Sequence, residues 1–239
     1  MTMFDFEDGC GAVPAHRHPN GMGWVANTAQ VADTAYVGPE ARVYGDAQVS
    51  GQARVYGQAW IFGSARVYGW ARVSEDAWVH AQARVGGFAR VSGLARVYGE
   101  ARVYGQARVS GKALVSGYAR VDGDARVEGN AWVHEQGRVS GDARVDGDAR
   151  VSGQALACGH AHVTFRCTGA FETSPIVVQL SKWLAGEVAP GVFGIGCRDV
   201  DLANYDEDKL TQWGLHNGAT EQDVALVRML LRVLGGGEL

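Results

Sequence analysis

The side chains best suited to metal binding or proton transfer are cysteines and histidines, and nine of these eleven residues fall into three groups along the chain. The C-terminal group is Cys158, His160, His162 and Cys167, the N-terminal group is Cys10, His16 and His18, and the central pair is His80 and His134. Thiolate and imidazole are favoured zinc ligands, and an imidazole can also act as a general base. The alternative is that these are ordinary capping and surface residues, and the elements that carry them decide between the two.

A six-residue repeat organises most of the chain. An aliphatic residue recurs at every sixth position from Val25 to Val163, apart from an alanine at position 157, which gives (163 − 25)/6 + 1 = 24 positions. Alanine stands two residues before almost every one of them, and glycine usually stands two residues after. This alternation predicts short strands with alanine and valine on one side, and the glycines permit sharp corners between the strands.

Three such strands predict one coil of a narrow, three-sided prism. Valine and alanine are too small to fill a wide sandwich core, and a strand of about four residues must stack on others to be stable. Coils of three hexads give 24/3 = 8 coils, and a rod about 38 Å long at a strand spacing of about 4.8 Å. The intervals between Trp24, Trp60, Trp78 and Trp132 are all whole multiples of three hexads, so these four residues belong to one face. We therefore predict an all-β solenoid over residues 25–165, a parallel β-helix of about eight triangular coils.

The three faces of this prism present different side chains. The face with the tryptophans presents an aromatic set that we predict to be a binding interface, namely Trp60, Phe62, Trp78, His80, Tyr98, Trp132 and His134. Each of the other two faces presents a column of arginines, with acidic residues nearby. An ordinary solvated surface, in which the arginine stems shield the sheet, accounts for these columns. Arg84, Arg90, Arg102 and Arg108 have the fewest acidic neighbours and are candidates for binding an anion or a nucleic-acid backbone.

The repeat resembles the hexapeptide-repeat, left-handed parallel β-helix family, in which a small residue follows an aliphatic one four positions later. Matching pairs are Val43 with Ala47, Val97 with Ala101, and Val121 with Ala125. The resemblance implies a left-handed coil and, as one alternative, a trimeric acyl-coenzyme A-dependent acyltransferase with His80 or His134 as general base. The hexads run without the loop insertion that such enzymes use, and these two histidines lie three coils apart, about 14 Å. We therefore expect no catalysis by either residue.

The same family includes zinc carbonic anhydrases, but their histidine spacing and accompanying acid and arginine motifs are missing here. Cys158 and His162 are predicted to emerge on different faces, with His160 at the corner between them. We predict neither a metal nor another cofactor, and keep Cys158, His160, His162 and Cys167 as a weak alternative.

Residues 1–24 and 166–239 lack the repeat. We expect the first segment to be a cap in which Phe4 and Phe6 cover the open end of the prism, because a solenoid exposes apolar core and unpaired strand edges there. The second segment is predicted to be a small α/β module with strands at 176–178 and 192–195 and helices at 202–213 and 224–234. Its sequence Ile195-Gly196-Cys197-Arg198, followed by an acidic helix, resembles the tail of hexapeptide-repeat proteins encoded by phages and prophages.

The composition narrows the function. A net charge of −4 argues against binding nucleic acid by bulk charge, and no apolar run approaches the roughly 18 residues that a membrane span needs. The absence of a signal-peptide pattern and of C-x-x-C pairs favours a reducing cytoplasm, that of the host if the protein is viral. We predict a non-enzymatic scaffold, a dimer or trimer, that binds a protein partner through the aromatic face and the C-terminal module. A host defence component is one candidate partner, and an acyltransferase and an anion or nucleic-acid binder are the alternatives.

Overall fold

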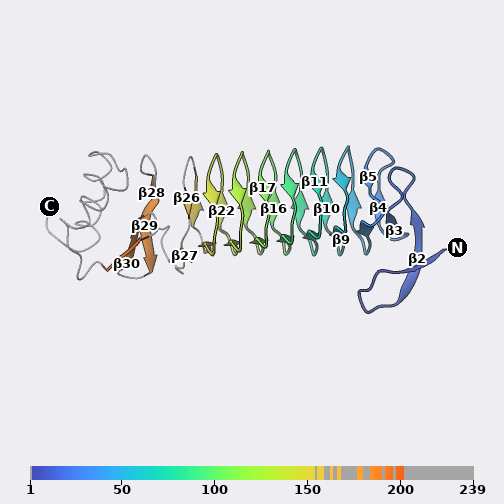
Figure 1. Cartoon of the computed structure of the whole chain (residues 1–239), viewed down its shortest axis with the longest axis horizontal. Coiled ribbons are helices and arrows are strands. Elements are labelled where there is room, and N and C mark those ends of the chain that lie inside the picture. Colours follow the sequence, from blue (N-terminus) through green and yellow to red (C-terminus); the bar gives the residue numbers. More distant parts are fainter. Residues whose placement is uncertain are drawn as a thin grey trace.

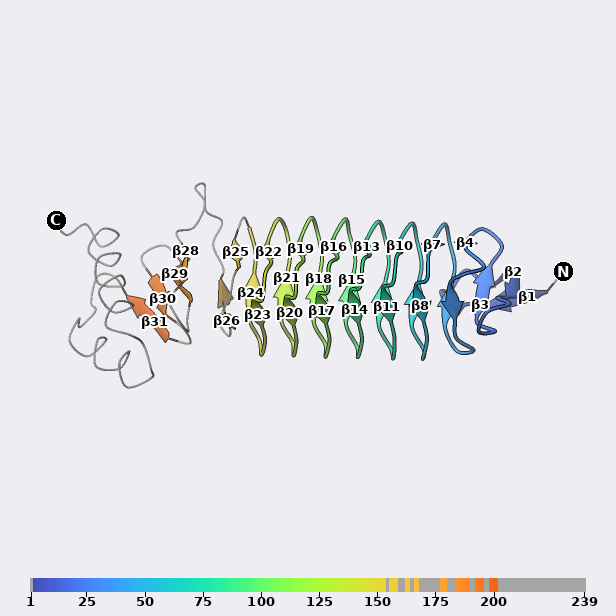
Figure 2. The ribbon, with the colours of Figure 1, turned by 90° about the horizontal axis from the view of Figure 1, so that it is seen from above.

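The computed structural model describes residues 2–153 and 155–158, together with the strand segments 162–163, 166–167, 177–179, 184–189, 192–195 and 198–201. Every regular element in these segments is a β-strand. Short strands follow one another around a central axis, and successive coils stack along it (Figures 1 and 2). No helix that could cross a bilayer occurs in the described part of the chain.

The strands form three long sheets, one on each side of the coil. The first sheet contains β1 (Met3–Asp5), β2 (Ala12–Arg17), β3 (Trp24–Ala26), β6 (Arg42–Val43), β9 (Trp60–Ile61), β12 (Trp78–Val79), β15 (Arg96–Val97), β18 (Leu114–Val115), β21 (Trp132–Val133), β24 (Arg150–Val151) and β27 (Arg166–Cys167). The second sheet contains β4 (Gln30–Val31), β7 (Gln48–Val49), β10 (Arg66–Val67), β13 (Arg84–Val85), β16 (Arg102–Val103), β19 (Arg120–Val121), β22 (Arg138–Val139) and β25 (Leu156–Ala157). The third sheet contains β5 (Tyr36–Val37), β8 (Arg54–Val55), β11 (Arg72–Val73), β14 (Arg90–Val91), β17 (Arg108–Val109), β20 (Arg126–Val127), β23 (Arg144–Val145) and β26 (His162–Val163).

The pairing register confirms a coil of three hexads. Arg66 pairs with Arg84 and Val67 with Val85 in parallel strands, and 84 − 66 = 18. From Val25 to Val151 the first sheet thus covers (151 − 25)/18 = 7 complete turns, against the eight coils expected from the repeat. The next pairing joins Val151 to Cys167, which falls short of a complete coil because 167 − 151 = 16, so the regular register ends there. The hand of the coil stays a prediction from the resemblance.

The core is the column of inward alanines and valines that the repeat predicts. Val25, Val43, Ile61 and their equivalents on the other sheets are fully buried in a single continuous cluster. Because the inward residues are small and nearly identical in every coil, each coil fits directly on the next. All outward positions are therefore free to differ without disturbing the core.

The corners between strands require a left-handed backbone conformation. Glycine fills this position in most coils, with φ between about +62° and +71° from Gly45 to Gly153. Glu75, Ala81 and Glu135 are exceptions with φ of 60°, 58° and 56°. The carboxylates of Glu75 and Glu135 accept hydrogen bonds from the backbone N–H of Gly93 and Gly153 in the next coil, which offsets the strain. The methyl group of Ala81 cannot form such a bond.

We expect Ala81→Gly to stabilise the protein by about 1 kcal/mol, because the left-handed conformation costs an alanine more than a glycine. The measurement is thermal unfolding followed by circular dichroism. The opposite substitution at an equivalent corner, Gly105→Ala, should lower the melting temperature, since its Cβ would lie 2.9 Å from the Gly123 backbone. A lower melting temperature for Ala81→Gly would contradict this account.

The N-terminal segment differs from the expected cap. Strands β1 and β2 form an antiparallel hairpin, and β2 pairs antiparallel with β3, so the hairpin extends the first sheet. Phe6 is buried against Tyr44 on the outer surface of that sheet, in a cluster separate from the alanine and valine core. The prediction that Phe4 and Phe6 cover the open end of the prism is therefore wrong, because β2 continues the first sheet at the edge of β3 and the two phenylalanines stack on Trp24 and Tyr44 at the outer surface of that sheet.

Residues 18–23 contact the first coil at its open end. The Val37 N–H donates to the Asn20 carbonyl, and the Asn20 side-chain amide donates to the Ala35 carbonyl. Gly21 and Gly23 lie so close to Val37 that any Cβ there would overlap it. These contacts satisfy backbone groups that would otherwise be an unpaired edge.

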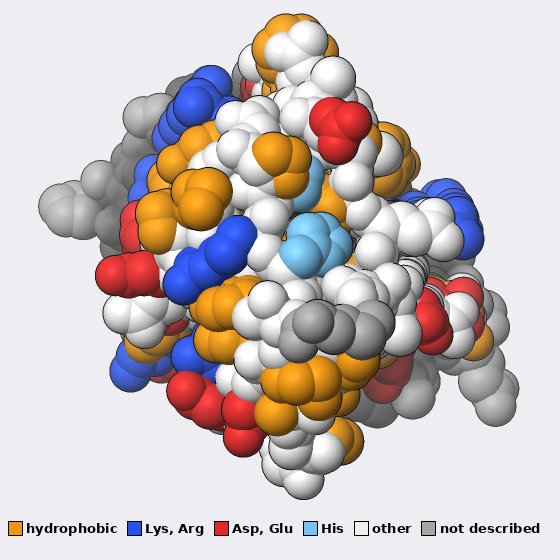
Figure 3. All heavy atoms as spheres, turned by 90° about the vertical axis from the view of Figure 1, so that its right-hand side faces the viewer, with side chains coloured by type: hydrophobic (Ala, Val, Ile, Leu, Met, Phe, Trp, Pro, Cys, Tyr) orange, Lys and Arg blue, Asp and Glu red, His pale blue; other side chains and the backbone are white. Residues whose placement is uncertain are grey.

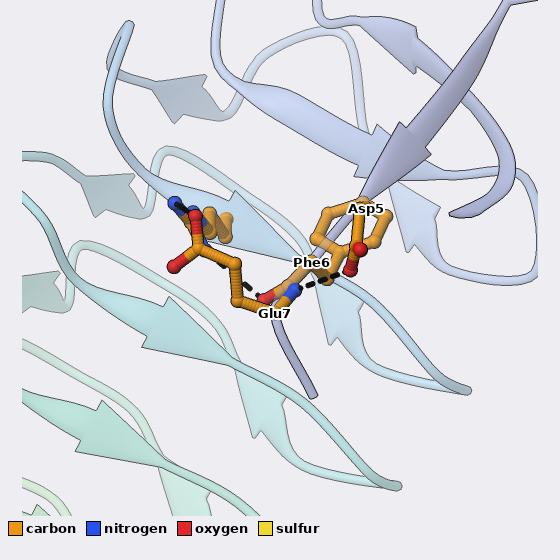
Figure 4. A network of polar contacts seen from close by, with 4 residues as sticks. Asp5, Phe6 and Glu7 are labelled. Atoms are coloured by element: carbon orange, nitrogen blue, oxygen red, sulfur yellow. Dashed lines mark hydrogen bonds and ion pairs between the residues drawn. The ribbon is translucent and has the colours of Figure 1, made fainter. Parts of the chain in front are cut away.

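Arg42 fixes the hairpin to the first sheet. Its guanidinium donates to the Phe6 carbonyl and forms an ion pair with Glu7, each at 3.0 Å, while the Glu7 N–H donates to the Asp5 carboxylate (Figure 4). The hydrogen bond from Arg42 lowers the pKa of the Glu7 carboxyl. The hairpin is thus bound by ring packing, by a salt bridge and by strand pairing.

Beyond the coil, four antiparallel strands form a separate sheet: β28 (Val177–Gln179), β29 (Leu184–Ala189), β30 (Val192–Ile195) and β31 (Arg198–Asp201). The strand predictions at 176–178 and 192–195 agree with β28 and β30. The helices predicted at 202–213 and 224–234 lie outside the described residues, as does most of the segment that resembles phage-encoded proteins.

Candidate interaction surfaces

The predicted aromatic face is the outer surface of the first sheet, and two of its tryptophans, Trp60 and Trp78, form a stacked column. All four strand tryptophans lie on this sheet. The Trp60 and Trp78 indoles are stacked with centroids 5.1 Å apart and planes 6° apart. The Arg42 guanidinium lies 4.9 Å from the Trp60 ring and that of Arg96 lies 4.6 Å from the Trp78 ring. Both ends of the stack therefore carry a cation–π contact.

A second column of rings runs beside it at the corner after each strand. Tyr44 stacks on Phe62 at 5.0 Å, Phe62 on His80 at 4.6 Å, and His80 on Tyr98 at 5.1 Å, with each pair within 4° of parallel. In-register parallel strands place equivalent side chains about 4.8 Å apart, which brings the rings into contact. Phe6 of the hairpin covers the first ring, and burial raises the pKa of Tyr44 to about 12. Because the ring faces contact one another, this column presents ring edges to solvent.

Trp132 and His134 form a separate pair further along the sheet. Leu114 and Ser116 occupy the equivalent positions in the coil before them and interrupt both columns. The Trp132 ring lies 4.2 Å from the His134 ring, and its Nε1 donates to Ser116 Oγ at 3.1 Å. Of the predicted interface residues, the structure thus groups Trp60, Phe62, Trp78, His80 and Tyr98 and leaves these two apart.

A groove of about 440 Å³ lies beside the tryptophan column, on the side away from the Phe62 row. Its lining residues are Gln58, Trp60, Asp76, Trp78, Leu94, Arg96, Lys112 and Leu114. Leu94 is 49% exposed, whereas all of the predicted interface rings are partly buried. Apart from the two tryptophans, the groove residues are not among those predicted from the sequence to form the interface. Their positions in the hexad, two residues before or within strands of the first sheet, would have assigned them to this face.

Neither His80 nor His134 lines the groove. His80 lies between the rings of Phe62 and Tyr98, and His134 Nδ1 lies 3.7 Å from a Glu135 carboxylate oxygen. Burial, and then the nearby charge of Arg96, lowers the pKa of His80. Burial also lowers the pKa of His134, with Glu135 opposing the change. Both imidazoles pack as ring neighbours on the outer surface of the sheet.

These lowered pKa values predict that the protein loses stability in acid. The unfolded chain takes up a proton near the ordinary histidine pKa of about 6.5, whereas the folded chain does so only at lower pH. Between the two values the unfolded state binds more protons, so the free energy of unfolding falls as the pH falls. His80→Phe keeps a ring in the stack but removes the titrating imidazole. We expect its melting temperature to fall less than that of wild type between about pH 7.5 and pH 5.5. An equal loss in both proteins would contradict the assignment.

The arginines form two columns, on the second and third sheets, in register along the rod. Figure 3, which looks along the rod from its N-terminal end, shows basic side chains at several places around the profile, including a row that recedes along the right-hand edge. Arg144 forms ion pairs with Glu128 at 3.2 Å and Asp146 at 2.9 Å. Within residues 2–153, no ion pair involves Arg84, Arg90, Arg102 or Arg108.

The structure also exposes aromatic residues that the sequence analysis did not single out. Trp70 and Phe88 lie at the corner between the second and third sheets, 53% and 60% exposed. Trp70 stands outside the strands, so the spacing of the strand tryptophans does not include it. It precedes Phe88 by one coil (88 − 70 = 18) and therefore shares its column.

The cysteine and histidine groups do not form a described metal site. No group of three or more histidine, cysteine or acidic residues suited to a metal ion occurs among the residues that the structure describes. His16 Nδ1 is 2.9 Å from the Asn27 side-chain oxygen, and Cys10 is exposed. His160 and the side chains of His162 and Cys167 lie outside the described residues.

The fold and repeat define a parallel β-solenoid repeat protein. A family model described as "YdcK Beta solenoid repeat" matches residues 95–111, 101–117 and 119–135, all of which lie within the regularly stacked coils. No curated protein and no solved structure matches the chain.

Proposed function

We propose that this chain is a non-enzymatic binding scaffold whose groove on the first sheet binds the same groove of a second copy. The groove supports this most directly, because its apolar lining is open to solvent. Leu94, Leu114 and the edges of two stacked indoles form that lining. Exposed apolar residues beside aromatic side chains are typical of places where binding energy concentrates.

The charges of the groove favour a second copy as the occupant. Asp76 lies in the lining one coil before Arg96 and two coils before Lys112, so the acidic and basic residues of the groove are separated along the rod. In a twofold arrangement with antiparallel rods, Asp76 of each copy would approach the basic end of the partner groove. An isologous interface pairs one patch with itself, so a groove with both signs of charge is self-complementary.

An acyltransferase has less support. A general base must reach the proton that it removes, and the two histidines considered for this role lie outside the groove. Binding of one groove to another requires only that their shapes and charges be complementary. A foreign protein, such as a component of a host cell, is the competing occupant and is distinguished by the measurement below.

The test is the molar mass in solution, measured by light scattering after size exclusion. We expect wild type to have twice the chain mass of 25.4 kDa, and Leu94→Glu to be a monomer that melts like wild type. Tyr118→Glu is the matched control, because Tyr118 is 61% exposed at a different corner, outside the groove. A monomeric wild type at about 100 µM would overturn self-association and leave a foreign protein as the occupant.

A charge exchange tests the orientation. Asp76→Lys and Lys112→Asp should each weaken the dimer, and the double variant should restore it if these residues face each other across the twofold axis. Additive weakening in the double variant would contradict the antiparallel arrangement.

A further inference from the structure

The corner between the second and third sheets carries exposed aromatic side chains in three successive coils. We call Tyr68, Trp70, Phe88 and Tyr104 the aromatic ridge; their exposed fractions are 41%, 53%, 60% and 38%. The Trp70 and Phe88 rings are nearly parallel, 13° apart with centroids at 6.3 Å. These rings are more exposed than those on the first sheet, where neighbouring rings and the hairpin cover one another.

A glycine allows one ring of the ridge to reach over the next coil. A Cβ at residue 86 would overlap the Tyr68 ring, so Gly86 leaves the space that this ring occupies over the next coil. In the column of Trp70 and Phe88, Gln52 precedes and Gln106 follows by one coil each. No other ring of this column therefore covers the outer face of Trp70 or of Phe88.

Arginines border the ridge on both sides. Arg66, Arg84 and Arg102 of the second sheet lie on one side, and Arg72, Arg90 and Arg108 of the third sheet lie on the other. All six are exposed, and within residues 2–153 none of them forms an ion pair.

The acidic residues in this stretch lie elsewhere. Between positions 66 and 108 they are Glu75, Asp76 and Glu100, all at the other two corners of the coil. Asp122 and Asp124 occupy the same corner one coil beyond Tyr104, and Asp122 forms a hydrogen bond with the Tyr104 side chain at that end of the ridge. Basic side chains therefore outnumber acidic ones around Tyr68, Trp70 and Phe88, although the whole chain has a charge of −4.

We propose that the aromatic ridge and its six flanking arginines bind single-stranded nucleic acid. The arginines would contact phosphates on both sides, and unpaired bases would stack on the exposed rings, the combination by which proteins hold single strands without reading sequence. Duplex bases are already stacked on one another and cannot use the rings. An acidic peptide could contact the arginines but would leave the rings exposed.

The test is fluorescence anisotropy of a labelled oligothymidylate of about 20 nucleotides, with the full chain and increasing salt. We expect a Kd of about 1–100 µM at about 0.15 M salt, tighter at lower salt, and weaker binding to a duplex of equal length. Trp70→Ala combined with Phe88→Ala should weaken binding roughly tenfold or more without changing the dependence on salt. Arg84→Gln combined with Arg90→Gln should instead reduce the slope of log K against log salt by about 1.4, since each phosphate contact contributes about 0.7.

Two matched variants control for general surface effects. Tyr118→Ala removes an aromatic ring of similar exposure at another corner, and Arg138→Gln removes an arginine of the second sheet three coils past Arg84. Both should bind like wild type. The proposal is overturned if no binding occurs at low salt, if the ring substitutions have no effect, or if polyglutamate competes as well as the oligonucleotide. The groove variants on the first sheet should not change this binding, so the two proposals can fail separately.

Discussion

Val103→Asp is expected to abolish the fold of the coil. Val103 is completely buried and lies between Val85 and Val121 of the neighbouring coils in the second sheet. An aspartate there would place a charge among alanines and valines with no polar partner, at a cost of several kcal/mol. Domains of this kind have a total stability of about 5–15 kcal/mol, so most or all of the folded population should be lost.

The measurement is circular dichroism and thermal unfolding of this variant beside Arg102→Asp. Arg102 is the preceding residue and points outward, so its substitution should change the free energy of unfolding by less than about 1 kcal/mol. Melting of Val103→Asp like wild type would mean that inward and outward positions are exchanged. Destabilisation of both variants to the same extent would mean that the effect is due to negative charge rather than to burial.

The inward half of the structure could be predicted from the sequence because it depends on period alone. A strict six-residue repeat with alternating side chains determines which residues face the axis and which share a column, and the register of Arg66 with Arg84 agrees with it. The contacts between outward side chains depend on ring orientation as well. The columns of Phe62 and Trp78 could be located, but not the stacking that covers their faces and leaves only their edges free.

Features without a period were harder to predict. The hairpin has no repeat. A phenylalanine near a chain end could pack across the end of the prism or in a cluster on its side, and the sequence does not distinguish these two placements. The salt bridge from Arg42 and the pairing of β2 with β3 decide between these, and both are long-range contacts. The aromatic ridge was missed for a different reason, because Trp70 stands at a corner rather than within a strand.

The hairpin also covers the edge of the first sheet at β3. Its strand β2 occupies the edge of β3, and the Arg17 guanidinium lies 4.1 Å from the Trp24 ring. Without the hairpin, β3 would present unpaired N–H and C=O groups beside exposed rings of Trp24 and Tyr44. Such an edge is a template for pairing with another chain, and solenoids depend on end caps for solubility.

Deletion of residues 2–17 is therefore expected to cause concentration-dependent assembly that the full chain does not show, and to lower the melting temperature by several degrees. The deletion leaves residues 18–23 in place, so the contacts of Asn20 with Val37 and Ala35 still cover the open end of the core, and the coil itself should remain folded. Light scattering over a range of concentrations measures the assembly, and Cys10→Ser in the full chain is the control that leaves the hairpin intact while removing its exposed thiol. A truncated chain that keeps the mass and melting temperature of the control would show that the paired hairpin neither protects the edge of β3 nor stabilises the rings of the first sheet.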